Sequence, residues 1–380
     1  MGLTGTALAI DAGNSKTDVA LVATDGRVLA TARGGGFRPP AVGTARAVDV
    51  LAPLVASVLA QAGPGRPADG PADAPGDDPA HGLVGQLAAF LANADLPVEE
   101  ARLTDEIASR GWARTVTVRN DTFALLRAGL PDDGEPVGVA VVCGAGINCA
   151  GLGRDGATAR FPSLGRISGD WGGGSCLADE ALWCAARAED GRGAPTELAR
   201  ALPAHFGLTT MAELIEALHL HDIPGHLRHE LPPVLFAVAD AGDRIARTLV
   251  TRQAEEITLL ARVALERLGL LGEPTPVILG GGVLAARHPL LHDHLTQLLA
   301  QHTPKAVPSV VTAPPVLGAA LHALDRAGAK AEAYGRVRSV WGEGAGGRHP
   351  TRTLSPRQVS ARSPGASTSS RAGPRHEAGA

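Results

Sequence analysis

The stretch "AIDAGNSKTDVALV", residues 9–22, contains two apolar runs separated by a polar turn with one glycine. Polar side chains are costly inside buried strands unless they meet hydrogen-bond partners or a ligand. The stretch therefore predicts two strands joined as a β-hairpin, and it leaves two interpretations of the turn open. The turn is either an ordinary solvent-exposed connection or a loop whose backbone binds phosphate.

The length and composition indicate a globular protein that is large enough for two domains. The chain has 380 residues, of which 44% are hydrophobic and 19% are charged. Its four cysteines have spacings unlike those of zinc sites, so we expect reduced thiols. Neither an uninterrupted apolar run of membrane-spanning length nor a signal peptide is evident. We therefore expect a cytoplasmic protein with no membrane partner.

The net charge of −4 is unevenly distributed along the chain. From Lys330 onward there are nine Lys or Arg against three Glu, so this end carries about +6 and the remainder about −10. An acidic body argues against nucleic acid as the partner. The segment 330–380, rich in Gly, Ser, Pro and Arg, is expected to be a disordered basic tail.

The hairpin pattern occurs twice. Residues 137–153, "VGVAVVCGAGINCAGLG", again contain an apolar strand, a glycine turn and a second strand. Two halves that each begin with a hairpin predict a duplicated α/β protein with a cleft between domains 1–125 and 136–328. The Pro-, Gly- and Asp-rich segment at about 63–82 is expected to be a disordered loop within the first domain.

Three turns of small residues share one design: "DAGNSKT" (11–17), "CGAGINC" (143–149) and "LGGGV" (279–283). Small residues allow backbone N–H groups to approach phosphate oxygens closely. None of the three is a P-loop or a convincing dinucleotide fingerprint. Each alone is consistent with an ordinary tight turn, but together and in this order they indicate a nucleotide site.

In that order the three turns resemble the two phosphate motifs and the adenosine motif of the ATPase superfamily of actin, Hsp70 and sugar kinases. With "VRNDTFALLRAG" (118–129), "GRISGDWGGGS" (165–175) and "VLGAALHAL" (316–324), residues 7–328 resemble the N-acetylglucosamine kinase-like proteins of the BadF/BadG/BcrA/BcrD ATPase family. The resemblance implies duplicated ribonuclease H-like domains, the actin-like ATPase fold, with an interdomain cleft.

The resemblance also implies ATP and Mg²⁺ as cofactors, with Asp11 helping to position the metal. Gly318 and Ala319 match the small residues where the last helix packs at the interdomain hinge. Ala145 stands where the family more often has Thr or Ser. The implied phosphate-binding residues are Gly13, Asn14, Ser15, Lys16, Thr17, Gly144, Ala145, Gly146 and Asn148, and the adenosine turn is Gly280, Gly281 and Gly282.

Asp121 matches the family's catalytic carboxylate, which takes the proton from the attacking sugar hydroxyl. From the residues alone, an Asp directly before "TFALLRAGL" is equally suited to cap a helix. Both interpretations stay open at this point.

The sugar is expected to contact Asp170, whose carboxylate suits a ligand with many hydroxyl donors, and also Asn120. Trp171 follows Asp170 where relatives usually have Glu, and its ring could stack on a sugar. Arg38 lies in a region where many relatives place a sugar-binding Asn. Its positive charge suits a substrate with a carboxylate or phosphate.

We therefore expect an ATP-dependent kinase that acts on a small-molecule sugar, N-acetylglucosamine or a related amino sugar, with Asp121 as general base. One alternative is an ATPase that activates a dehydratase, which would need cysteines to bridge two subunits through an iron–sulfur cluster. Another is a non-catalytic sensor of sugar or nucleotide on the same fold. The sequence leaves open whether the protein forms a homodimer.

Overall fold

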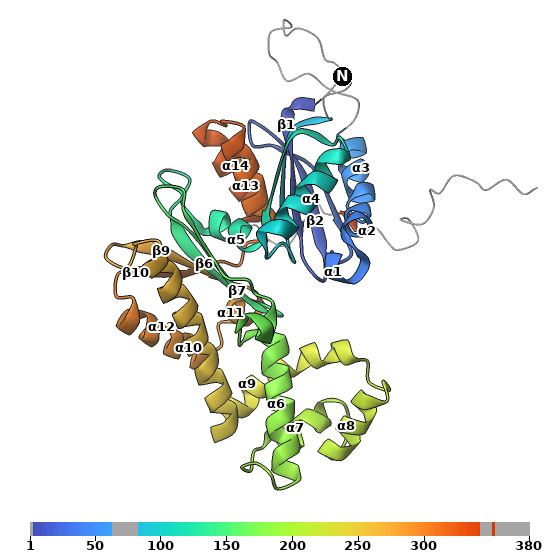
Figure 1. Ribbon diagram of the computed structural model, residues 1–380, viewed down its shortest axis with the longest axis vertical. Coiled ribbons are helices and arrows are strands. Elements are labelled where there is room, and N and C mark those ends of the chain that lie inside the picture. The colour runs from blue at the N-terminus through green and yellow to red at the C-terminus, as the bar shows by residue number, and fades with distance from the viewer. Residues whose placement is uncertain (1–2, 63–82, 343–351, 354–380) are drawn as a thin grey trace, which may run out of the picture.

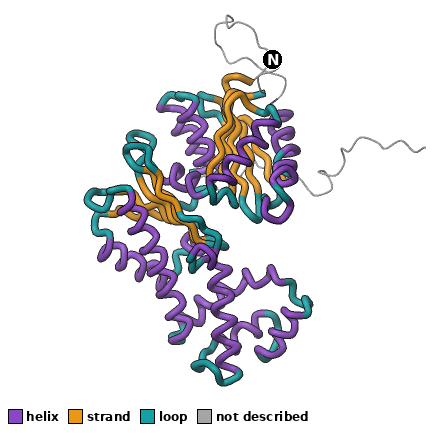
Figure 2. The backbone as a smooth tube through the Cα atoms, viewed as in Figure 1, coloured by secondary structure: helices purple, strands orange, loops and turns teal. Residues whose placement is uncertain are grey.

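The computed structural model describes residues 3–62, 83–342 and 352–353. Two β-sheets lie in separate layers with helices packed around them, and the second half extends into a helical region formed by α6 to α9 (Figure 1). Figure 2 shows the strands gathered in two groups between the helices. The α/β class and the duplicated, hairpin-first arrangement expected from the sequence are confirmed.

The first sheet begins with the hairpin that contains residues 9–22. Strands β1, β2 and β3 are antiparallel, whereas β4 and β5 run parallel to β1. Along β1, Ala7 and Ala9 face one apolar layer and Leu8 and Ile10 face the other, as the two-residue period of a strand requires. The spatial order is β11 (Arg352–Thr353), β3 (Val28–Gly34), β2 (Thr17–Ala23), β1 (Leu3–Ala12), β4 (Val84–Leu91) and β5 (Ala113–Asn120).

The second sheet repeats this plan. Strand β6 forms an antiparallel hairpin with β7 and pairs in parallel with β9. The spatial order is β10 (Ala306–Val310), β9 (Thr275–Gly280), β6 (Gly138–Cys143), β7 (Ile147–Leu152) and β8 (Thr158–Arg160). Both sheets therefore place a tight turn at the end of their first strand.

The helices cover the sheets and build the extension. Those of the first half are α1 (Pro39–Val42), α2 (Thr44–Asp49), α3 (Ala52–Gln61), α4 (Pro97–Ser109) and α5 (Thr122–Gly129). Those of the second half are η1 (Gly165–Ser168), α6 (Gly173–Glu189), α7 (Leu198–His205), α8 (Met211–His219), η2 (Gly225–Glu230), α9 (Leu231–Asp240), α10 (Arg244–Arg267), α11 (Gly282–Ala285), α12 (Pro289–His302), α13 (Val316–Arg326) and α14 (Ala331–Trp341).

Helices α5 and α13 pack against each other at very short range, where the sequence predicts a hinge of small residues. A Cβ atom added at Gly318 would lie 1.8 Å from the carbonyl oxygen of Ala124. No side chain larger than hydrogen fits there without moving a helix. Gly318 therefore fixes the contact between the last core helix and the helix that follows β5.

The expectation of disorder from Lys330 onward is wrong for residues 331–341, which form α14. Ala333, Val337 and Trp341 recur at a spacing of four residues and are buried in the layer that contains α13. This spacing gives the helix one apolar face despite its basic composition. Lys330 and Gly342 flank this helix. The remaining residues of the expected tail, apart from β11, lie outside the described part of the chain, as does the expected loop at 63–82.

The segment Thr44–Gln61 is, among the described residues, the one with the length and mean hydropathy of a membrane span. In the structure a turn divides it into α2 and α3. Its residues Leu54, Val55 and Val58 are buried in the apolar layer that covers the first sheet. The segment therefore packs as part of the first domain.

Candidate active site

The first predicted phosphate turn lies between β1 and β2. The N–H of Gly13 donates to the carbonyl oxygen of Lys16 at 2.8 Å, which closes the turn, and residues 14–16 are exposed. The buried Thr17 donates its hydroxyl to the carbonyl oxygen of Gly35 at 2.8 Å. The segment after β3 also packs on the turn, because the N–H of Phe37 donates to the carbonyl oxygen of Gly13 at 2.9 Å. The turn is thus held from one side and open on the other.

Asp11 and Asp121 reach the same edge of the first sheet. Strands β1, β4 and β5 are parallel and lie in that order, with Asp11 opposite Phe90 and Phe90 opposite Arg119, so the carboxyl ends of β1 and β5 lie at the same edge, separated by β4. Burial raises the pKa of Asp11 well above its ordinary value, and the charges of Asp121 and Asp18 raise it further. The predicted metal-binding carboxylate, Asp11, and the predicted catalytic carboxylate, Asp121, therefore lie close enough to interact.

Among the described residues, Asp18 has an arginine partner, whereas Asp11 has none. The guanidinium of Arg33 holds both oxygens of the Asp18 carboxylate, at 2.6 and 3.0 Å. Within the described part of the chain, neither a hydrogen bond nor an ion pair satisfies the carboxylate of Asp11. A buried carboxylate without a cation partner is a natural place for a metal ion.

The donor set suits Mg²⁺ that arrives with a phosphate. This ion is usually held by one or two carboxylates together with substrate phosphates and water. Asp11 supplies a buried carboxylate at this edge of the sheet. Over the described ranges, no group of three or more His, Cys, Asp or Glu side chains could hold a metal by itself. Phosphate oxygens would have to complete the coordination.

The second predicted phosphate turn connects β6 and β7 and rests on the first turn of α6. The N–H of Gly174 donates to the carbonyl oxygen of Gly144 at 2.7 Å, and the N–H of Ser175 donates to that of Ala145 at 2.9 Å. A Cβ atom at Gly173, where φ is +82°, would lie 2.4 Å from the carbonyl carbon of Gly146. Glycine at position 173 therefore permits this close approach.

The third predicted turn follows β9 and touches the second. A Cβ atom at Gly281, where φ is +88°, would lie 2.5 Å from the carbonyl group of Cys143 and 2.8 Å from the backbone nitrogen of Gly144. Gly280 is buried behind it, against Leu125, and Gly282 begins α11. The structure thus brings the predicted phosphate turn and the predicted adenosine turn of the second half into direct contact.

Asp121 stands at the N-cap position of α5 but does not cap the helix. Its side chain forms no capping hydrogen bond. The side-chain oxygen of Asn120 instead accepts the N–H of Thr122 at 3.0 Å. Burial raises the pKa of Asp121 to about 6, although the N–H of Thr122 favours the charged form. Of the two interpretations of Asp121, the geometry supports the one in which its carboxylate is available to a ligand.

A polar network joins the two domains beside Asp121. Asn120 donates its amide to Asp95 at 2.8 Å, and Asn148 donates its amide to Asn120 at 3.2 Å and to Asp95 at 3.4 Å. Burial, and then the charge of Asp121, raise the pKa of Asp95 to about 7. Asn148, a predicted phosphate contact, thus directs its amide to this network, and the amide of the buried Asn120 is bonded to protein.

Sequence reasoning missed Asp95 and Asn93, which lie in the loop after β4. Asn93 donates its amide to the side-chain oxygen of Asn14 at 2.9 Å. The polar run "NAD" at 93–95 follows a buried strand, and β4 ends beside β5, with Leu91 opposite Asn120. That run was the available signal, because the carboxyl ends of neighbouring parallel strands gather ligand-binding side chains.

Arg38 lies beside the first phosphate turn. Its Nε donates to the carbonyl oxygen of Asn14 at 2.8 Å, and the residue is exposed. This contact leaves the far end of the guanidinium at the surface of the site. The structure therefore places a positive charge next to the turn, where the sequence predicts a substrate contact.

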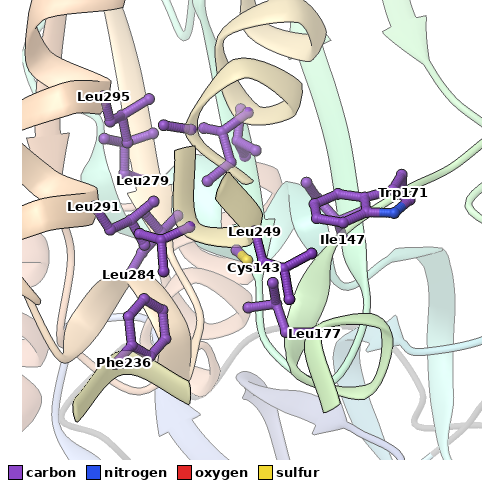
Figure 3. Packing of buried hydrophobic residues seen from close by; sticks show 14 of the residues in the cluster. Cys143, Ile147, Trp171, Leu177, Phe236, Leu249, Leu279, Leu284, Leu291 and Leu295 are labelled. Carbon is purple, nitrogen blue, oxygen red and sulfur yellow. The ribbon is translucent and has the colours of Figure 1, made fainter. Parts of the chain in front are cut away.

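Asp170 and Trp171 lie in the loop between β8 and α6. The Asp170 carboxylate accepts the N–H of Gly165 at 3.1 Å and the hydroxyl of Ser168. Trp171 is only 6% exposed and packs with Ile147 and Leu177 in the apolar core (Figure 3). The guanidinium of Arg252 lies 4.2 Å from its ring centroid. In this conformation the ring anchors the loop and presents no open stacking face to a sugar.

The family model described as "BadF/BadG/BcrA/BcrD ATPase family" matches residues 8–323, which include all three turns and the Asp121 network. This chain belongs to that ATPase family. The family and the two-domain fold predicted from the sequence are confirmed.

Two curated relatives are sugar kinases by name. An N-acetyl-D-glucosamine kinase of Dictyostelium discoideum is 27% identical over 233 residues, which cover 59% of this chain and 72% of the relative. An N-acetylmuramic acid/N-acetylglucosamine kinase of Clostridium acetobutylicum is 25% identical over 214 residues, covering 56% of this chain and 69% of the relative.

Solved structures share the fold of this BadF/BadG/BcrA/BcrD family member. A Chromobacterium violaceum protein, provisionally named an N-acetylglucosamine kinase, matches with a TM-score of 0.61 and 22% identity over 84% of this chain and 99% of that one. A ROK hexokinase from Thermus thermophilus matches with a TM-score of 0.53 and 16% identity over 85% and 99% of the two chains. At these identities the likeness establishes the architecture.

Proposed function

We propose that this protein is an ATP-dependent sugar kinase that phosphorylates N-acetylglucosamine or a related amino sugar such as N-acetylmuramic acid, and that it acts in the cytoplasm, where ATP is available. One observation carries the proposal: the partly buried Asp121, whose carboxyl does not cap α5, shares a sheet edge with Asp11 beside the first predicted phosphate turn. The names of the curated relatives supply the substrate class.

The three turns form the ATP site in this proposal. The exposed turn at 13–16 and the turn at 144–146 would bind the phosphates through backbone N–H groups, and Gly280 to Gly282 would pass beside the adenosine. Asp11 would hold Mg²⁺ together with phosphate oxygens, and the ion would neutralise the charge of the transferred group. Lys16, exposed at the tip of the first turn, adds a positive charge there.

Asp121 acts as the general base for the attacking sugar hydroxyl. A pKa of about 6 leaves its carboxylate ionised at neutral pH yet basic enough to accept a proton as the oxygen attacks phosphorus. Asn120 serves as a positioning residue, because its hydrogen bonds to Asp95 and to the N–H of Thr122 fix the end of β5. Asp170 and Arg38 bind the sugar, the first through hydroxyl groups and the second through an anionic substituent.

The two cysteines beside the second turn do not favour the dehydratase-activating ATPase. Cys143 and Cys149 flank the second turn and are buried in the apolar core. Burial raises the pKa of the Cys143 thiol to about 12 and that of Cys149 also rises, so both are held as protonated thiols. Ligands that bridge two subunits would have to be exposed thiolates.

The deciding experiment measures ADP release from Mg·ATP with a panel of amino sugars and plain hexoses. We expect sugar-dependent turnover that falls by about 100-fold or more in Asp121→Asn, while binding of Mg·ATP is retained. Asp105→Asn, at an exposed position of α4, serves as the matched control. ATP hydrolysis at a rate independent of added sugar would instead support the ATPase that activates a dehydratase. Nucleotide binding without turnover would support the non-catalytic sensor.

A further inference from the structure

A cavity of about 430 Å³ lies along α5, apart from the three turns and the Asp121 network. Its walls come from β4, β5, α5, the segment that leads to β6, α13, α14 and Leu152 of β7. Its volume falls in the range of small-molecule sites. The cavity contacts both sheets and the closely packed helices α5 and α13.

Arg119 is the unusual group in this cavity. Its guanidinium lies 3.9 Å from the centroid of the Phe123 ring, and among the described residues it forms neither a hydrogen bond nor an ion pair. Burial lowers its pKa. The nearby Arg160, by contrast, is paired with Glu100 at 2.6 Å. Glu100 attracts Arg119 electrostatically, but its two carboxylate oxygens are already hydrogen-bonded to Arg160 and to the N–H of Asn120. An anion that enters the cavity would give this desolvated cation a hydrogen-bonded partner of its own.

The other charges of the cavity balance one another. Arg127 holds both oxygens of Asp325, at 2.7 and 3.0 Å, and donates to Asp132 at 3.0 Å. Arg338, just behind, also binds Asp132. Two arginines and two carboxylates thus cancel. The cavity is left with the single positive charge of Arg119, which suits a ligand with one negative charge.

The remaining wall suits a ligand with an apolar body and few polar atoms. His322 lines the cavity as a neutral ring, because burial lowers the pKa of its imidazole to about 4. Its Nε2 is itself buried, so the ring adds no charge to the wall. The apolar wall consists of Phe90, Phe123, Leu126, Leu130, Leu152 and the ring of Tyr334.

We propose that this cavity binds a small monocarboxylate with an apolar or aromatic body. The planar carboxylate pairs with the guanidinium of Arg119, whose fork matches it in shape and charge. The body packs between the rings of Phe123 and Tyr334 and the leucines. This site is separate from the ATP and sugar sites, so its existence does not depend on the proposed kinase activity.

Isothermal titration calorimetry with phenylacetate tests this site. The neutral alcohol 2-phenylethanol is titrated in parallel as the uncharged control. We expect one phenylacetate per chain with a Kd on the order of 1 mM, and at least about tenfold weaker binding of the alcohol. Saturating Mg·ATP or N-acetylglucosamine should not displace the probe. Displacement by either, equal affinity for acid and alcohol, or no binding of phenylacetate would overturn the proposal.

Two variants locate the site. Arg119→Met keeps an apolar chain on Phe123 but removes the charge, and it should weaken phenylacetate binding about tenfold or more. Leu152→Trp fills the cavity from the second sheet and should abolish binding while leaving Arg119 in place. Arg102→Met, at an exposed position of α4, should change nothing. Unaltered binding in both Arg119→Met and Leu152→Trp, each folded by circular dichroism, would place the carboxylate elsewhere.

Discussion

Arg160 of β8 donates to the carboxylate of Glu100 on α4 at 2.6 Å, and this ion pair joins the two halves of the chain. The other oxygen of Glu100 accepts the N–H of Asn120 at 2.8 Å. Arg160 also donates to the carbonyl oxygen of Ala94 at 3.1 Å. One carboxylate therefore couples the second sheet to the residue directly before Asp121.

The variant Arg160→Met tests this coupling. It leaves Glu100 partly buried without its cation, and hydrogen bonds to charged groups contribute about 1.5–3 kcal/mol. We expect the free energy of unfolding in urea to fall by about that amount, and KM for the sugar to rise. Arg262→Met removes an exposed pair with Glu266 at 3.4 Å and should cost less than about 1 kcal/mol. Equal losses in the two variants would show that the ion pair to Glu100 has no special role.

The raised pKa of Asp121 predicts an acid limb in the pH profile. With a folded-state pKa of about 6, the carboxyl is protonated below that pH and cannot accept the hydroxyl proton. We expect kcat/KM for the sugar to rise tenfold per pH unit below about pH 6 and to level off above it. Because Asp95 titrates nearby, the observed midpoint belongs to the pair. A profile that stays flat well below pH 6 would contradict a base role for Asp121.

The close contact between Gly173 and Gly146 predicts that Gly173→Ala damages the second phosphate turn. The new Cβ would overlap the Gly146 carbonyl group at a backbone conformation that L residues rarely adopt. We expect a lower melting temperature and a KM for ATP raised several-fold, with a smaller change in KM for the sugar. Gly272→Ala, where a Cβ meets open space, is the matched control. A variant that keeps the KM for ATP would show that the turn does not bind phosphate.

The three turns could be predicted from sequence because small and polar residues between apolar runs are a local signal. Gly281 of the third turn occupies a place that excludes a Cβ, as do Gly173 beside the second turn and Gly318 at the contact of α13 with α5. The duplication was visible for the same reason, since each half repeats the strand, turn and strand pattern. Local signals of this kind decide the fold before any long-range contact is known.

Features that depend on long-range contacts were missed or only partly described. Asp95 gains its position from the parallel register of β4 and β5, which joins segments far apart in the chain. The amide direction of Asn148 and the burial of Trp171 depend on how the two halves meet. In α14, basic and small residues separate the apolar positions, so the composition of the segment indicated disorder. Packing of the apolar face against α13 stabilises the helix.

Arg38 predicts a preference for an acidic substrate. Its Nε donates to the carbonyl oxygen of Asn14, and the rest of the exposed guanidinium makes no further hydrogen bond to the described residues, so it is free to bind a ligand beside the predicted phosphate turn. N-acetylmuramic acid carries a carboxylate that N-acetylglucosamine lacks, so the two sugars form a matched pair of probes. We expect Arg38→Met to lower kcat/KM for N-acetylmuramic acid by about tenfold or more and that for N-acetylglucosamine by much less, because a charged hydrogen bond contributes about 1.5–3 kcal/mol. The neutral sugar then serves as the internal control for folding and ATP binding. An equal decrease in kcat/KM for both sugars would mean that Arg38 acts by stabilising the turn and does not bind the carboxylate of the substrate.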